Sequence, residues 1–347
     1  MPMALLTPFP QAPAAGETLE VSPGVFWLRM PLPFQLDHIN LWLLRDGEGW
    51  TLIDTGFAGD DTRAAWESIL GRLAGPIHRL VVTHFHPDHL GLATWLLEKT
   101  GAQLWMTAAE FLTAHAVWNE IGGHGARFMT EQFRQHGLSG ELLERFAQRG
   151  SGYTRAVPAL PQHYQRLLAG DRLAVDGCDW QVVVGHGHSP EHAALYCREL
   201  GVLISGDMLL PRISTNISVM AVTPAADALG SYLASLDTMA REIPDSTLVL
   251  PSHGLPFQGI RERVAALHAH HGERLQAVED ECEAPKSAAE LLATLFPRPL
   301  DTHQTMFALG EAIAHLNHLE IAGRLSRTLG GDGVIRFARA DQVRLEN

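Results

Sequence analysis

The chain has 347 residues, of which 46% are hydrophobic and 19% are charged, and its formal net charge is −13. This composition indicates a globular protein with enough apolar material for a sizeable core. The acidic balance argues against a broad nucleic-acid-binding surface, which needs clustered Lys and Arg. No apolar run reaches the roughly 18 to 20 residues of a membrane span.

The first hundred residues alternate between strand and helix patterns. Residues 17–56 contain apolar runs separated by the turn sequence RDGEG, which predicts strands joined by a hairpin. Helices are predicted over 60–73 and 88–101, and strands over 77–84 and 102–107. This alternation favours an α/β fold with helices packed on a sheet.

Residues 108–170 differ from the segments on either side. They carry helical patterns broken by glycine-rich turns and show no clear strand, which predicts a helical insertion. Strand patterns then return over 171–185, 193–207 and 246–254.

After about residue 260 the strand signal fades. Helices are expected there, the last over 305–328, followed by a closing hairpin at 330–339. We therefore predict a main domain over 1–260 and a mostly helical, winged-helix-like domain over 261–347.

The stretch THFHPDH at residues 83–89 places three histidines and an aspartate directly after a buried strand. Imidazole and carboxylate groups are ligands that suit zinc and its first-row neighbours. His84 and His86 alternate along an extended segment, so both can face one position. Pro87 then turns the chain, so that Asp88 and His89 can face a second position. Because one catalytic zinc ion needs only about three protein ligands, the cluster indicates two metal ions.

Three further candidate ligands follow apolar runs elsewhere in the chain. His188 follows VVVG, Asp207 ends VLISGD, and His253 lies in LVLPSHG. Turns at strand ends are where a sheet presents functional groups along one edge. An aspartate placed between two cations can bridge them with its two oxygens.

These motifs resemble the metallo-β-lactamase superfamily of metallohydrolases. The matching pieces lie in the family's order over roughly residues 20–260: LIDTG at 52–56, THFHPDH at 83–89, GHSPEH at 187–192, SGD at 205–207 and PSHG at 251–254. The resemblance implies an αββα sandwich of two mixed sheets with helices outside, and makes residues 1–260 the catalytic domain. Flavodiiron oxygen reductases of this fold carry Glu where this chain has His86, and no flavin-binding domain of the expected length follows. An oxidoreductase is therefore disfavoured.

The resemblance also assigns the metal ligands. One metal ion would be held by His84, His86 and His188, the other by Asp88, His89 and His253, and Asp207 would bridge them. The expected cofactors are two zinc ions, with manganese or iron as the alternatives.

Supporting residues are expected around these ligands. Asp54 follows a buried strand, where an unpaired carboxylate would be costly. It is expected to accept a hydrogen bond from a ligand imidazole and so fix its orientation, with a turn-forming role as the alternative. Thr83 and His192 are further candidates, although His192 could simply pack at the start of the next strand.

The predicted chemistry is hydrolysis. Two cations about 3.5 to 4 Å apart can share one water and yield a bridging hydroxide. Asp88 is expected to position that hydroxide and to pass a proton to the leaving group. We predict a metal-dependent hydrolase of a small ester, thioester or lactone. The alternatives are a nuclease or phosphodiesterase of the same fold, and a metal-binding regulatory protein with vestigial activity.

The substrate contacts are expected to come from the helical insertion, which would cover the metal cleft with an apolar pocket. The candidates are Trp118, Phe128, Tyr153 and Tyr164, with His38 approaching from the other side. The alternatives are that the aromatic residues form the insertion's own core and that His38 lies at the edge of the main core.

The carboxy-terminal domain holds more acidic than basic residues, whereas a winged helix that reads DNA should be basic. We expect this domain to mediate formation of a homodimer or to form one wall of the active site. The expected partner is a small-molecule substrate, without nucleic acid or membrane. In HAHHGER at 268–274 only His268 and His271 share a helix face, and no carboxylate partner is evident, so a solvated face is expected.

Cellular location is expected to be cytoplasmic. Cys178, Cys197 and Cys282 are odd in number and far apart, so no disulfide framework is expected. The first residues also lack the basic start and apolar run of a secretory signal.

Overall fold

The structure, a computed structural model, describes residues 5–150 and 152–340. Its contacts divide the chain into two units. The first unit comprises residues up to Trp118, Gly152–Thr215 and Ser235–Val264, and the second comprises Asn119–Ser151, Asn216–Ala234 and the residues from Ala265 onward. As a domain boundary, residue 260 stays a prediction. None of the described helices is long and apolar enough to cross a membrane.

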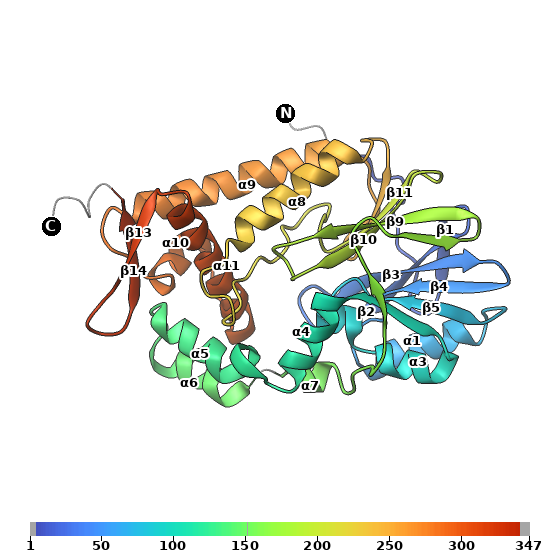
Figure 1. The fold of residues 1–347 in the computed structure, drawn as a ribbon, viewed down its shortest axis with the longest axis horizontal. Coiled ribbons are helices and arrows are strands. Elements are labelled where there is room, and N and C mark those ends of the chain that lie inside the picture. Colours follow the sequence, from blue (N-terminus) through green and yellow to red (C-terminus); the bar gives the residue numbers. More distant parts are fainter. Residues whose placement is uncertain (1–4, 151, 341–347) are drawn as a thin grey trace. The chain divides into compact units, whose positions relative to one another are not determined.

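The first unit is built on two mixed β-sheets whose inner faces share one core (Figure 1). The seven-stranded sheet runs in sequence order: β1 (Thr18–Ser22), β2 (Val25–Pro31), β3 (His38–Asp46), β4 (Gly49–Ile53), β5 (Ile77–Val81), β6 (Gln103–Thr107) and β7 (Gln165–Leu167). The five-stranded sheet has the order β12 (Leu248–Pro251), β11 (Val202–Gly206), β10 (His192–Cys197), β9 (Cys178–Gly185) and β8 (Arg172–Val175). The predicted α/β class with two mixed sheets is confirmed.

Large apolar side chains fill the space between the sheets. Trp27 and Trp42 stack in the first sheet with ring centroids 6.1 Å apart, and Trp180 belongs to the same buried cluster in the second sheet. Each fully buried side chain of this size stabilises the fold by roughly 1.5 to 3 kcal/mol. The core therefore holds both sheets in a fixed relation, which a site built from both of them requires.

The helices of the first unit are short. They are α1 (Asp60–Leu70), α2 (Pro87–Leu90), α3 (Ala93–Thr100), α4 (Ala108–Trp118) and α7 (Tyr153–Ala156), and the last part of α8 (Ala228–Glu242) also belongs to this unit. In α1 the buried residues Ala65, Trp66 and Ile69 form one stripe. The Trp66 indole donates to the main-chain oxygen of Thr55 at 2.8 Å, so this helix anchors the loop that follows β4.

The sequence prediction differs from the structure at two places in this unit. The single helix predicted over 88–101 is divided into α2 and α3 around Gly91. A Cβ on Gly91 would lie 2.7 Å from the Gly56 oxygen and 2.8 Å from the Ala58 nitrogen, so the chain approaches the loop after β4 too closely for a side chain. The region predicted to lack strands contains β7, which pairs in parallel with β6.

The second unit is mainly helical. Its elements are the 3-10 turn at Gly122–His124, α5 (Ala126–Gln135), α6 (Gly140–Arg149), most of α9 (Ile260–Glu281), the 3-10 turn at Ala289–Leu291, α10 (Leu292–Leu295), α11 (Thr302–Ile321), β13 (Leu325–Leu329) and β14 (Ile335–Arg339). Helix α11 begins with a capping box between Asp301 and Gln304. The helix predicted over 305–328 is too long, because α11 ends at Ile321 and the left-handed Gly323 turns the chain into β13.

The histidines of α9 are also placed differently from the prediction. His271 is fully buried, so the predicted solvated face at 268–274 is wrong there. Burial and the neighbouring His315 lower the pKa of His271 to about 3. Both His271 and His315 are fully buried, and their contacts are considered below.

Candidate metal centre

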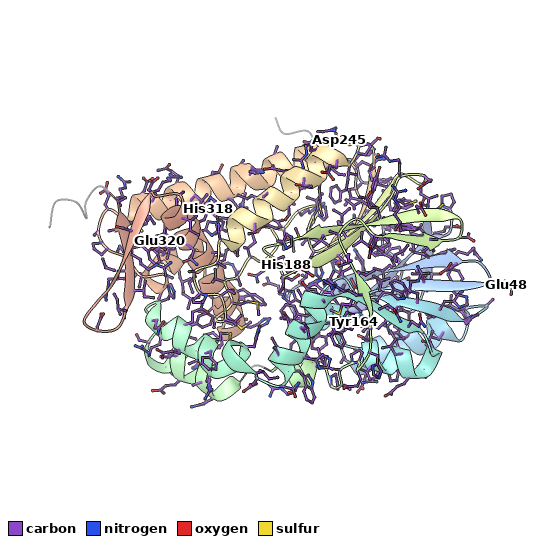
Figure 2. The ribbon with its side chains drawn as sticks, viewed as in Figure 1. Glu48, Tyr164, His188, Asp245, His318 and Glu320 are labelled. Atoms are coloured by element: carbon purple, nitrogen blue, oxygen red, sulfur yellow. The ribbon has the colours of Figure 1, made fainter. Side chains whose placement is uncertain are left out.

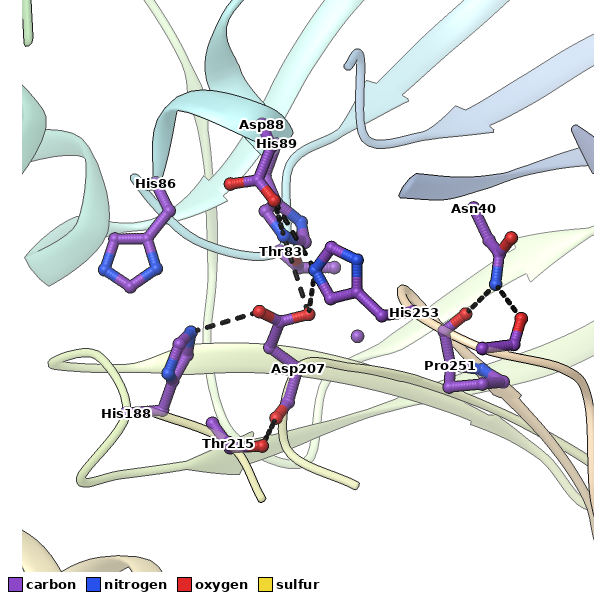
Figure 3. A network of polar contacts seen from close by, with 12 residues as sticks. Asn40, Thr83, His86, Asp88, His89, His188, Asp207, Thr215, Pro251 and His253 are labelled. Atoms are coloured by element: carbon purple, nitrogen blue, oxygen red, sulfur yellow. Dashed lines mark hydrogen bonds and ion pairs between the residues drawn. The ribbon is translucent and has the colours of Figure 1, made fainter. Parts of the chain in front are cut away.

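The seven predicted metal ligands follow strands of both sheets, either in loops or, for Asp88 and His89, in the short helix α2. His84, His86, Asp88 and His89 follow β5, where the chain turns into α2 at Pro87. His188 lies between β9 and β10, Asp207 directly follows β11, and His253 lies two residues after β12. The structure brings all seven together, and Figure 3 labels each of them except His84.

A first group consists of three imidazoles. His84 Nε2 lies 2.9 Å from His86 Nδ1 and 3.2 Å from His188 Nε2. The other ring nitrogen of His84 lies 3.0 Å from the Thr83 hydroxyl, which leaves Nε2 of a neutral ring as an acceptor. In the absence of an ion, the single lone pair of His84 Nε2 would have to accept from both other rings, whereas one cation could bind a lone pair from each of the three nitrogens.

A second group consists of Asp88, His89 and His253. Asp88 Oδ2 lies 3.7 Å from His89 Nε2 and 3.5 Å from His253 Nε2. His89 Nε2 is buried and has no hydrogen-bond partner among the described residues, which is a costly state for an acceptor. A cation would also satisfy this group.

Asp207 lies between the two groups (Figure 3). Its Oδ2 is 3.4 Å from His188 Nε2, and its Oδ1 is 3.4 Å from His253 Nε2 and 3.6 Å from His89 Nε2. One carboxylate oxygen thus faces each group, as a bridging ligand requires. The Thr215 hydroxyl donates to the Asp207 main-chain oxygen and holds this residue in place.

The two groups differ in their electrostatic surroundings. Burial and the adjacent His188 lower the pKa of His86 to about 3. Burial acts in the same direction on His253, but the charges of Asp207 and Asp88 raise its pKa to about 10. The carboxylates therefore concentrate negative potential at the second group, which favours a bound cation over an empty site.

The predicted supporting residues Asp54, Thr83 and His192 form hydrogen bonds to the candidate ligands or to their main chain. Asp54 Oδ2 accepts from His89 Nδ1 at 2.8 Å, and Asp54 Oδ1 accepts from the Thr83 main-chain nitrogen at 2.8 Å. Asp54 adopts a left-handed φ of 62°, which Asp tolerates better than most residues. His192 Nε2 accepts from the Asp207 main-chain nitrogen at 3.1 Å. All three residues thus contact a ligand or its backbone.

The sequence reasoning missed Glu110, a fully buried carboxylate on α4. Its Oε2 accepts from the Phe85 main-chain nitrogen at 3.0 Å, and its Oε1 accepts from Ser189 Oγ and the Glu191 main-chain nitrogen, each at 2.7 Å. Burial raises its pKa to about 7, against these hydrogen bonds, which favour the ionised form. One carboxylate therefore joins the loop of His84 and His86 to the loop of His188.

His38 and its neighbours hold His253. The His253 Nδ1 donates to the main-chain oxygen of His38 at 2.9 Å, while the Gly254 main-chain nitrogen donates to His38 Nε2 at 3.0 Å. Asn40 Nδ2 donates to the main-chain oxygens of Pro251 and Gly254. These are the contacts of positioning residues, and as a substrate contact His38 stays a prediction.

The aromatic residues predicted to bind substrate have packing partners of their own. The Tyr153 hydroxyl donates to the Phe85 main-chain oxygen at 2.6 Å, and the Trp118 indole donates to the Val157 oxygen at 2.9 Å. Tyr164, which is labelled in Figure 2, stacks on Phe111 with ring centroids 4.1 Å apart. Phe128 belongs to the second unit, where Arg127 lies over its ring. As substrate contacts, these four residues stay predictions.

A cavity of about 290 Å³ opens beside His253 in the first unit. Its lining includes His38, Arg29 and Arg212. Arg29 is held by hydrogen bonds to Asn40 Oδ1 and the Gly254 oxygen, whereas Arg212 is exposed. The cavity is thus lined by the candidate ligand His253 and by two guanidinium groups.

Comparison with known proteins gives consistent results along the chain. Residues 35–253 match the family model described as Metallo-beta-lactamase superfamily, and residues 275–340 match Metallo-beta-lactamase-like, C-terminal domain. The crystal structure of a beta-lactamase domain protein from Burkholderia ambifaria is 49% identical with a TM-score of 0.90, over 97% of this chain and 98% of that chain.

Two curated relatives are more distant. Probable metallo-hydrolase YqjP of Bacillus subtilis (strain 168) is 25% identical over 85% of this chain and 92% of its own length. A hydroxyacylglutathione hydrolase of Albidiferax ferrireducens is 25% identical over 67% of this chain and 68% of its own length.

Proposed function

The chain belongs to the metallo-β-lactamase superfamily, and from this premise we propose that it is a dinuclear metal-dependent hydrolase of a small ester, thioester or lactone. The observation that carries the proposal is the position of Asp207, whose two carboxylate oxygens face two separate groups of ligand residues. A single-metal or purely structural site would need only one of these groups.

The chain's own residues divide the work at this site. His84, His86 and His188 would hold one ion, Asp88, His89 and His253 the other, with Asp207 contacting both. When bound, a pair of divalent ions, of which zinc suits these ligands best, supplies an activated water at neutral pH and polarises the substrate oxygen. Asp88 is the half-buried carboxylate of the set, and in the proposal it orients that water and carries a proton to the leaving group.

The cavity beside His253 supports an acyl substrate with a negatively charged group. Arg29 and Arg212 provide two guanidinium groups, which bind carboxylates through charge-assisted hydrogen bonds. Its volume of about 290 Å³ suits a small ligand rather than a folded polymer. Thioester hydrolysis has additional support, since one relative carries the name hydroxyacylglutathione hydrolase.

The test is a substrate panel assayed on zinc-loaded protein beside His86→Ala. Thioesters, lactones, carboxylic esters, phosphodiesters and RNA should be compared, with acids such as lactate in the acyl part. We expect thioester or lactone turnover that falls at least about 1,000-fold in His86→Ala. Turnover of RNA or phosphodiesters alone would establish the nuclease alternative. No turnover in any class, with zinc bound, would favour the regulatory alternative.

We also propose that the protein is a homodimer without a nucleic-acid partner. Light scattering in solution should then give about twice the chain mass of 38.0 kDa. A mass equal to one chain at micromolar concentration would contradict the dimer and leave the hydrolase proposal intact.

A further inference from the structure

The second unit contains another group of metal-binding side chains. His270 and His271 on α9 and Glu311 on α11 place one ligand atom each within 4.8 Å of the others. His271 is 0% exposed and Glu311 is 8% exposed. The two histidines are adjacent on one helix, and the carboxylate comes from the other helix, so no short sequence motif joins them.

The hydrogen bonds around His315 fix the proton positions in this group. A main-chain oxygen can only accept, so His315 Nδ1 donates to the Glu311 oxygen at 2.8 Å. His315 Nε2 is then the acceptor of a neutral ring, and His271 Nδ1 donates to it at 3.3 Å. The lone pair of His271 is consequently on Nε2. A histidine whose other nitrogen is engaged in this way is the usual form of a metal-binding histidine.

Two buried acceptors in this group have no donor. His271 Nε2 and Glu311 Oε1 have no hydrogen-bond partner among the described residues. Leaving a buried acceptor unsatisfied costs about 1 to 3 kcal/mol, and more for a charged group. Because both atoms can only accept when the ring is neutral and the carboxyl is ionised, they cannot satisfy each other. A cation between them would satisfy both.

Arg274 does not provide this partner. The Arg274 Nη1 atom lies 3.9 Å from Glu311 Oε1, beyond hydrogen-bonding distance. It donates instead to the Leu295 main-chain oxygen at 3.0 Å, and Arg274 Nε donates to His270 Nε2 at 3.0 Å. The guanidinium thus offsets part of the charge of Glu311 but leaves the two lone pairs open. For His270 to bind the ion as well, its Nε2 atom would have to give up the hydrogen bond from Arg274 Nε.

We propose that His270, His271 and Glu311 form a second metal site, separate from the centre in the first unit, for one zinc ion or a similar divalent transition-metal ion. Two imidazoles and one carboxylate are a ligand set that zinc accepts. The bound ion would link α9 to α11 inside the second unit. The role of this ion would be structural, because His271 is fully buried.

The experiment compares the zinc content of full-length protein variants after chelation and dialysis against micromolar zinc. Glu311→Gln keeps the side-chain volume and removes the charge, and His271→Gln removes the imidazole. His268→Gln on the same helix is the matched control, because His268 is outside the group. We expect both site variants to hold about one equivalent less zinc per chain than the wild type and His268→Gln. Equal zinc content in all four proteins would overturn the proposal.

Anomalous diffraction from zinc-soaked wild-type crystals gives a result that does not depend on folding of a variant. The expected peak lies between His271 Nε2 and Glu311 Oε1, whether or not zinc occupies the first unit. Density for water alone at that position would also overturn the proposal. Failure of the hydrolase proposal would appear separately, as zinc missing near Asp207.

Discussion

At the scale of single residues, the metal centre depends on which nitrogen of each imidazole carries a proton. Asp54 accepts from His89 Nδ1 and so leaves His89 Nε2 facing Asp88 and Asp207. The Thr83 and His38 oxygens have the same relation to His84 and His253. The surrounding acceptors therefore prepare the ligand lone pairs before any ion binds.

Asp54→Asn should weaken metal binding at the second group. Asn tolerates the left-handed φ of residue 54. It has only one acceptor oxygen, however, so its NH2 group must face either the Thr83 N–H or the His89 Nδ1–H, which donate to separate oxygens of Asp54. We expect the affinity for the ion at the second group to fall about 10- to 100-fold, measured by competition with a chromophoric chelator. Asp60→Asn, at an exposed position on α1, is the control. Unchanged affinity for every ion would contradict the positioning role of Asp54.

Residue patterns indicate the candidate ligands but not all of the residues that contact and position them. The motif around His84 is local, because four candidate ligands within six positions have few other uses. Glu110 leaves no such trace, since its partners Phe85, Ser189 and Glu191 are 25, 79 and 81 residues away along the chain. A main-chain acceptor such as the His38 oxygen has no composition signal at all. The only sequence signal for Glu110 is that it is a charged residue within a largely apolar helical stretch.

At the scale of elements, α4 connects the two ligand loops through Glu110. The first loop follows β5 in one sheet, and the second lies between β9 and β10 in the other. Strand positions were predictable from runs of buried apolar residues, as in β4 and β11. Helix ends were less so, because the end of α11 depends on Gly323 and on the pairing of β13 with β14.

Glu110→Gln should loosen both loops. The amide oxygen of Gln can accept from Ser189 in place of Glu110 Oε1. The NH2 group of Gln then faces the Phe85 N–H, so that two donors meet without an acceptor. We expect a loss of roughly 1 to 3 kcal/mol in the free energy of unfolding, with weaker metal binding and a lower kcat at unchanged KM. Urea unfolding, zinc competition and steady-state kinetics measure these effects. Glu98→Gln, at an exposed site on α3, should leave all three quantities unchanged.

The raised pKa of Glu110 predicts that the free energy of unfolding of the metal-free protein depends on pH. The pKa of Glu110 is about 7 in the folded state against an ordinary value of 4.5. Between these pH values the folded protein keeps a proton that the unfolded chain has released, so this group makes the free energy of unfolding fall as pH rises. The wild type's advantage over Glu110→Gln should shrink between about pH 5 and pH 7.5. An advantage that grows with pH would mean that the hydrogen bonds outweigh burial and hold the pKa of Glu110 below its ordinary value.

At the scale of the whole molecule, the seven ligands connect loops of both sheets in the first unit, whereas the site proposed between α9 and α11 lies within the second. An ion that binds only the folded state raises the free energy of unfolding by about 2.7 kcal/mol when its free concentration is 100 times its Kd. Metal binding in each unit should therefore stabilise that unit.

Chelation provides the test, and Glu311→Gln is the background that separates the two units. In this variant, removing zinc from the centre around Asp207 should lower Tm by roughly 5 °C or more, measured by calorimetry with and without chelator. Asp207→Ala combined with Glu311→Gln should show no such shift, because both sites are impaired and chelator has nothing specific to remove. A Tm that is insensitive to chelator in the Glu311→Gln protein would mean that the loops keep their positions without ions. The stabilisation would then come from Asp54, Glu110 and the core between the sheets.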